Sequence, residues 1–92
     1  MTDYILFGKY SPDAIKLVSS ERTKKGYDLV KKAGGNVKSM YALLGEKDLV
    51  MIAEFPDNEK AMQASIELFK LTGISFSAHP AIPVEKFDNL AK

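Results

Sequence analysis

The chain has 92 residues, of which 46% are apolar and 27% charged, and it contains no cysteine. This length fits one domain with a thin margin of stability, and the composition favours a globular fold over disorder. Thirteen basic and twelve acidic side chains leave a net charge of +1, so there is no basic excess for nucleic acid or anionic membranes, and disulfides and thiolate metal sites are excluded.

The first predicted element is a strand over residues 4–10, a short run rich in aromatic and branched side chains. Residues 11–13 (Ser-Pro-Asp) then start a helix, because a hydroxyl caps free amides and proline suits the first helical position. A second start signal at residues 19–21 predicts a split helical region whose longer second piece ends at the glycines 34–35. Gly26 weakens that piece, and no local rule accounts for it.

A hairpin of two strands is predicted next. Residues 37–44 and 49–55 are apolar runs, and the turn between them at residues 45–48 is polar and contains a glycine. We expect Gly45 to adopt a positive φ in this turn, because glycine does so without steric cost.

A second long helix follows Pro56, with Asp57 or Asn58 as its N-cap and Gly73 after its end. Apolar residues recur along it at helical spacing, which predicts the face turned to the core. The residues expected on this face are Met62, Ser65, Ile66 and Phe69, with Ala61 and Leu68 beside them. In the first helical region the corresponding residues are Ile15, Val18, Leu29, Val30 and Ala33.

The last predicted strand covers residues 74–78, where apolar residues alternate with serines. Pro80 and Pro83 are expected to end regular pairing. A terminal helical turn after Pro83 has Phe87 and Leu90 as its apolar anchors.

This order of elements, βαββαβ, predicts an α+β ferredoxin-like fold: a four-stranded antiparallel sheet with two helices on one face. Its first and third strands should lie in the middle, and both contain continuous apolar runs, residues 5–7 and 49–53, which indicate that both faces are covered. Because two helices cover only one face, we predict a homodimer packed sheet to sheet, with Met51 or Ile52 on the shared face. The terminal segment, residues 81–92, is the alternative cover.

Several segments in this order resemble the GYD domain family. The matching segments are Tyr-Ile-Leu-Phe-Gly-Lys-Tyr-Ser-Pro (4–12), Lys-Lys-Ala-Gly-Gly (31–35), Tyr-Ala-Leu-Leu-Gly-Glu-Lys-Asp-Leu-Val (41–50), Pro-Asp-Asn-Glu (56–59) and Val-Glu-Lys-Phe (84–87). Lys47 stands where the naming signature of the family has an aromatic residue before the aspartate. The resemblance implies a dimeric α/β barrel and provides no catalytic residues. The wider barrel group includes cofactor-free monooxygenases, isomerases, haem enzymes and ligand-sensing domains, and fold alone does not choose among them.

Four residues are candidates for a ligand site, and each also has an ordinary structural interpretation. His79, the only histidine, could act as a general base, or could simply bond to backbone or water at a strand end. Arg22 could bind a carboxylate, or lie over the helix edge with its head in water. Tyr10 and Tyr41 could line a pocket, or be core or interface residues, as could Tyr4. Glu54 could point inward, although such acids are usually solvated.

These observations predict a cytoplasmic, single-domain protein, residues 1–92, without signal peptide, membrane span, metal or cofactor. We expect it to form a homodimer and either bind a small organic molecule between sheet and helices or serve only in assembly. The alternative is a cofactor-free monooxygenase or isomerase with His79 as base and Arg22 or a tyrosine orienting an anionic substrate. A third interpretation is assembly with a partner protein through an edge strand, the second or the fourth.

Overall fold

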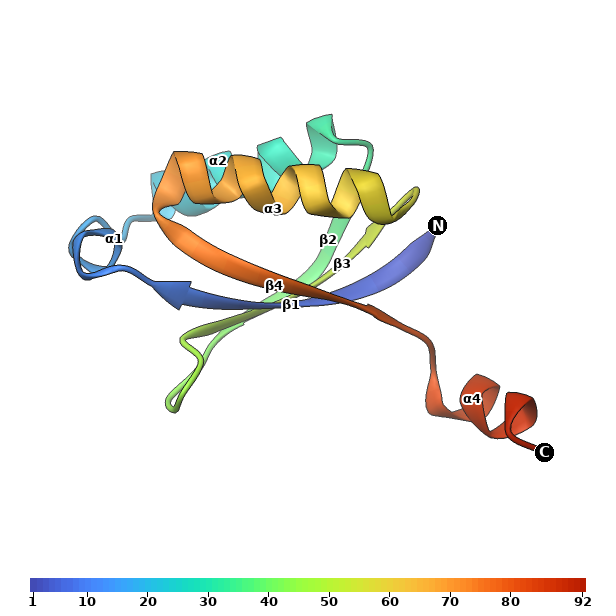
Figure 1. Cartoon of the computed structure of the whole chain (residues 1–92). Coiled ribbons are helices and arrows are strands. Elements are labelled where there is room, and N and C mark those ends of the chain that lie inside the picture. Colours follow the sequence, from blue (N-terminus) through green and yellow to red (C-terminus); the bar gives the residue numbers. More distant parts are fainter.

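Four strands form one antiparallel sheet in the computed structural model, which describes all of residues 1–92 (Figure 1). The order across the sheet is β2-β3-β1-β4, the ferredoxin-like arrangement that the element order predicts. The two runs that are continuously apolar therefore occupy the central strands, and β2 and β4 are the edges. The strands are β1 (Thr2–Tyr10), β2 (Asn36–Ala42), β3 (Leu49–Phe55) and β4 (Ile74–Ala81).

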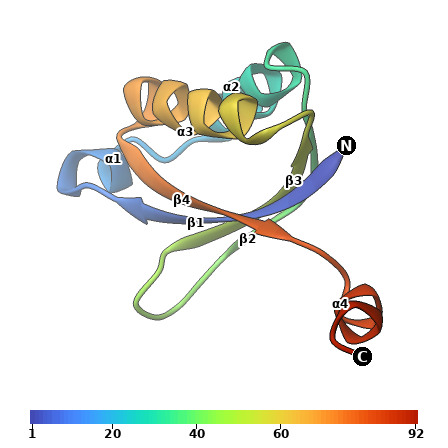
Figure 2. The same ribbon diagram turned by 45° about the vertical axis from the view of Figure 1, so that its right-hand side comes forward.

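Helices cover one face of this sheet, and the C-terminal helix lies away from it on the other side (Figures 1 and 2). The predicted split of the first helical region is confirmed, because a separate short helix precedes the longer one. The covering helices are α1 (Pro12–Lys16), α2 (Ser20–Lys32) and α3 (Asn58–Thr72), and the distant one is α4 (Val84–Leu90).

Local capping chemistry explains where the three covering helices begin and where α3 ends. Ser11, Ser19 and Asp57 accept hydrogen bonds from the amides three residues further on, at 3.0, 3.0 and 2.9 Å. These bonds satisfy amides that have no partner within the helix. Gly73 ends α3 with φ of 75°, a left-handed conformation that favours glycine.

The hydrophobic core lies between the helices and alternate residues of the sheet. On the central strands the helix-facing side chains are fully enclosed: Leu6 is 0%, Met51 1% and Phe55 0% exposed. Tyr4 is also buried, and its hydroxyl bonds to the side chain of Asn58 at the start of α3. The remaining core residues are Ala53 from β3, Val30 from α2, and Ala61, Ala64 and Leu68 from α3.

The predicted inner face of α3 is confirmed at Ala61 and Leu68 and wrong at its expected centre, so that the helix is rotated by part of a turn. Ala61, Ala64 and Leu68 are buried against the sheet, whereas Met62, Ile66 and Phe69 are exposed, and Ser65 is partly exposed. Both sets recur at helical spacing, so periodicity could not choose between them. The two alanines allow the helix backbone to approach the sheet closely, and this packing decides the rotation.

Smaller corrections concern the first helix and the turns. Ile15 and Val18 are exposed, and Ala14 is the residue that α1 buries. Gly45 does not adopt a positive φ, because the connection spans six residues, 43–48, closed by a backbone bond from Leu43 to Asp48, and needs no tight two-residue turn.

The last strand is longer than predicted. It runs to Ala81 and includes Pro80, which lies opposite Tyr4 of β1. β4 is an edge strand, so a residue without an amide hydrogen can be accommodated where only one side of the strand is paired.

Candidate functional site

A small cavity lies between the sheet, α2 and α3, where the sequence predicts ligand binding. Its volume is about 60 Å³, and eight of its twelve lining residues are hydrophobic. Met40 and Met51 line it from the sheet, Leu68 from α3, and Val18, which is exposed, from the segment before α2. Two of the predicted site residues, Arg22 and Tyr10, line this cavity together.

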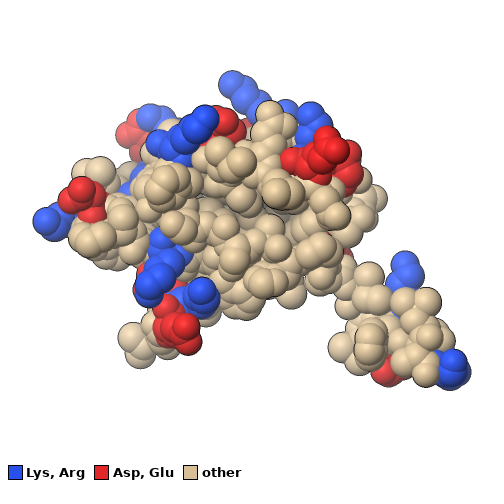
Figure 3. Space-filling view, viewed as in Figure 1, with Lys and Arg blue, Asp and Glu red and all other residues tan.

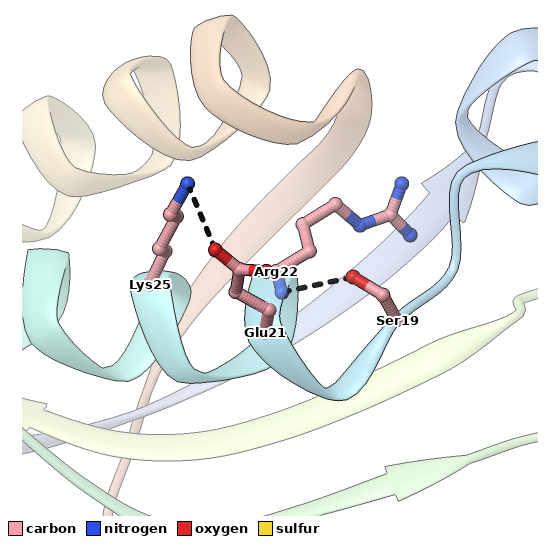
Figure 4. A network of polar contacts seen from close by, with 4 residues as sticks. All are labelled: Ser19, Glu21, Arg22 and Lys25. Carbon is pink, nitrogen blue, oxygen red and sulfur yellow. Dashed lines mark hydrogen bonds and ion pairs between the residues drawn. The ribbon is translucent and has the colours of Figure 1, made fainter.

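Arg22 is positioned by the start of α2. Its backbone amide donates to the Ser19 hydroxyl at 3.0 Å (Figure 4), which places the residue in the first turn. From there the guanidinium donates one hydrogen bond from Nη1 to the carbonyl of Ala14 at 2.6 Å and lies 5.8 Å from the ring centre of Tyr10. The arginine therefore ties α1 to α2 and stands over an aromatic face.

The positive charge of Arg22 has no acidic partner in the chain. The neighbouring Glu21 pairs instead with Lys25 at 3.7 Å, as Figure 4 shows, and none of the other ion pairs involves the arginine. No acidic residue lines the cavity. The site thus combines an apolar interior with one uncompensated cation.

His79 and Tyr41 lie on the opposite face of the sheet from Arg22. The histidine is opposite Ile5 on the edge strand β4, exposed, with Nε2 3.3 Å from the Ser77 hydroxyl. Tyr41 is on the other edge strand, opposite Val50, and is also exposed. One chain therefore does not assemble the constellation of histidine, arginine and tyrosine that the enzyme alternative requires.

The uncovered face of the sheet has an apolar centre. Ile5, Phe7, Val50 and Ile52 are partly exposed and form cross-strand pairs, Ile5 with Ile52 and Phe7 with Val50. The sequence left open whether Met51 or Ile52 faces away from the helices. In the structure Ile52 lies on the uncovered face, and Met51 is in the core. We call these four residues the open-face patch.

A charged cluster that sequence reasoning missed borders the open-face patch. The register of β2 shifts between Val37 and Ser39, and the ammonium of Lys38 reaches Asp3 at 2.8 Å and Glu54 at 3.8 Å. The hydrogen bond to Asp3, with both nearby carboxylates, raises the pKa of Lys38. Glu54 is therefore paired at the edge of this face and does not enter the cavity. The bulge that brings these residues together leaves no signal in the sequence.

In Figure 3 charged side chains lie along the upper edge of the helix layer, at α1, at the β2–β3 hairpin and on the C-terminal helix, whereas the front of the molecule over α3 and β4 is largely uncharged. A wider hollow of about 570 Å³ lies between α2 and α3. Lysines and acids such as Lys25, Asp28, Lys60 and Glu67 line it. Such a charged, exposed lining is typical of a helix surface, and we favour the smaller apolar cavity as the ligand site.

Helix α4 forms an arm that stands away from the sheet (Figures 1 and 2). It has no buried residue, and its apolar side chains Val84, Phe87 and Leu90 are exposed, Phe87 by 59%. The arm enlarges the radius of gyration to 13.7 Å, compared with about 12 Å for a compact chain of this length. The terminal segment therefore does not cover the open-face patch of its own chain.

No cluster of three or more histidine, cysteine, aspartate or glutamate side chains is arranged to hold a metal ion. No helix has the length and apolar character needed to cross a membrane.

Comparison with known proteins identifies a family and a similar fold. The family model of the GYD domain matches residues 4–91 of this chain. A search of curated proteins finds no significant match. Among solved structures, the leucine response regulatory protein of Mycobacterium tuberculosis has a similar fold, with a TM-score of 0.64, 10% sequence identity and 89% of this chain covered. The chain spans about half of that protein, 51% of its length. Because the GYD match covers essentially the whole sequence, the chain belongs to the GYD domain family.

Proposed function

We propose that the chain works as a homodimer whose sheets pack face to face, and that each subunit binds a small organic molecule in its sheet–helix cavity. The open-face patch carries the proposal of a dimer. Its four side chains occupy the centre of a sheet face that no helix of the same chain covers, and an apolar patch of this kind typically marks an association surface. A two-fold axis would place the patch of one copy against that of another.

The arm formed by α4 supports this assembly. Four strands spaced about 4.8 Å apart and about seven residues long give a flat face of roughly 450 Å². A typical stable interface buries about 800 Å² on each partner. In Figures 1 and 2 the arm lies on the same side as the open face, so that its exposed Phe87 and Leu90 are placed to extend the contact onto a second copy.

The cavity beside Arg22 supports ligand binding. It is largely apolar with one charged group, and ligand sites generally combine apolar walls with a few polar groups that orient the ligand. A protein of similar fold is described as a leucine response regulator, which is compatible with a ligand-binding role, although fold alone does not specify a ligand.

The dimer is tested with matched lysine substitutions on the two sides of the molecule. Ile52→Lys places a charge in the open-face patch, whereas Ile66→Lys places the same charge on the outer side of α3, where isoleucine is 55% exposed. We expect sedimentation velocity to show a dimer for the wild type and for Ile66→Lys, and a folded monomer for Ile52→Lys. Phe87→Asp should weaken the dimer to a smaller extent.

A wild-type monomer at about 100 μM, well above the micromolar dissociation constant of a weak dimer, would contradict the proposal, as would a dimer that persists in Ile52→Lys. Native mass spectrometry of the protein purified from its own host tests ligand binding. We expect a reproducible added mass of a small organic molecule, and its absence together with no binding in solution would leave assembly alone as the function.

A further inference from the structure

We propose that the sheet–helix cavity binds a short-chain monocarboxylate, with its carboxylate on Arg22 and its hydrocarbon end in the space beside Gly26. This inference rests on the proposed ligand-binding function and specifies the class of ligand. Three independent features of the cavity carry it: the unpaired charge at its wall, its size and lining, and a glycine in the middle of α2.

The positive charge of Arg22 at the cavity wall favours an anionic ligand. A guanidinium has five N–H donors in a fixed planar arrangement, and Arg22 uses one hydrogen bond to hold the carbonyl of Ala14. The remaining donors have no side-chain acceptor in the structure. A carboxylate matches this geometry through two parallel hydrogen bonds. A single cation neutralises one negative charge, which favours a monocarboxylate over a phosphate dianion.

The size and lining of the cavity restrict the rest of the ligand. One water molecule needs about 10–15 Å³ of such volume, so 60 Å³ accommodates roughly four to six non-hydrogen atoms, the size of propanoate or butanoate. The interior residues from the sheet, among them Leu49, Ile74 and Phe76, are apolar. An amino acid would bring an ammonium group that finds no carboxylate in the lining. An unsubstituted acid avoids this cost.

Gly26 accounts for the remaining space. A methyl group added there would meet only Leu68 Cδ2, at 3.6 Å, an ordinary contact distance. Alanine would therefore fit without a clash, and it would favour the helix, because alanine has a much higher helix propensity than glycine. Packing against the neighbouring side chains therefore does not require a glycine at this position. Gly26 does line the cavity, so the absence of a side chain leaves room for the ligand.

The test is a titration of the full-length protein with sodium butanoate, followed by NMR amide shifts and isothermal titration calorimetry. We expect shifts at residues around the cavity. Leucine and butylamine should bind at least tenfold more weakly than butanoate. Arg22→Gln should lower the affinity for butanoate at least tenfold, whereas Lys25→Gln, which removes a cation from α2 outside the cavity, should leave it unchanged.

Gly26→Ala provides a second measurement that does not depend on the contact between Arg22 and α1. It should raise the unfolding temperature and lower the affinity for butanoate at least tenfold. The proposal is wrong if butanoate does not shift these amides, or if Lys25→Gln reduces its affinity as much as Arg22→Gln does. If butanoate fails but butanol or another uncharged molecule binds the cavity, only the ligand class is overturned. If no small molecule binds at all, the proposed ligand-binding function fails as well.

Discussion

The two faces of the sheet are built from neighbouring residues of the same strands but have different surroundings. Along β1, Leu6 is completely buried by the helices, while Ile5 and Phe7 on either side of it are only partly covered. β3 repeats the contrast with Met51 and Ile52. A strand that is apolar on both faces is typically buried on both, and in this chain the helices bury only one of them. The difference leaves an apolar sheet face without cover in the single chain, and this is the face that the proposed dimer would bury.

The largest expected effect comes from removing a buried aromatic ring from the covered face, compared with removing one from the open face. Phe55 is fully buried and makes an edge-to-face contact with Tyr4 at 5.7 Å. We expect Phe55→Ala to lower the free energy of unfolding by about 3–5 kcal/mol. Phe7→Ala should cost less, because the ring is only partly covered in its own chain. Its cost should grow with protein concentration, because the proposed dimer would bury the rest of the ring.

Urea unfolding at two protein concentrations measures both variants. If Phe7→Ala is as damaging as Phe55→Ala at the lower concentration, the open face contributes to the stability of the single chain, and the contrast between the faces is wrong.

A smaller effect is expected from adding one methyl group to the covered face. A Cβ at Gly8 would lie 2.8 Å from Cε1 of Phe76 and 3.0 Å from Cγ2 of Ile74, so the packed side chains must move. We expect Gly8→Ala to cost about 1–3 kcal/mol. As a control, Ser77→Ala on the exposed side of β4 should change stability by less than about 0.5 kcal/mol. Thermal unfolding compares the two, and equal effects would show that the covered face tolerates added volume.

The smallest effect is a pH dependence at the border of the open face. The hydrogen bond to Asp3 raises the pKa of Lys38 above its ordinary value of 10.5. This raised pKa in the folded state means that the stabilisation is complete below pH 10.5 and is lost as the pH rises through the folded-state value.

The comparison is between the wild type and Lys38→Met by thermal unfolding at several pH values. Because the lysine side chain is 45% exposed, we expect the wild type to be slightly more stable at pH 8 and the difference to shrink above pH 10.5. A difference that grows with pH would contradict this assignment.

Local patterns predicted the elements of the fold well. The cap residues Ser11, Ser19 and Asp57 act on amides three residues away, so their effect is encoded within one helical turn. The continuous apolar runs likewise identified the central strands, because a side chain buried on either face must be apolar. The GYD resemblance is confirmed over residues 4–91.

The candidate site was less predictable because it depends on orientation. Arg22 and Tyr10 share one cavity, as the sequence interpretation allowed, but His79 and Tyr41 project from the other face. A shift of one residue along a strand moves every side chain to the other face of the sheet. The sequence around a residue on one strand does not specify which residues of another strand lie on the same face. Gly26 was the one available signal for the cavity, as a helix-weakening residue without a local explanation.

The sequence by itself determined the order of elements, the helix limits and the central strands of this protein. Each of these depends on residues close together in the chain. Only the tertiary structure decided that Ala64, and not Met62 and Ile66, faces the sheet. It also decided that Ile52 belongs to the open face and Arg22 to the cavity. These choices depend on how closely distant segments can approach, which is a property of the packed fold and not of any local pattern.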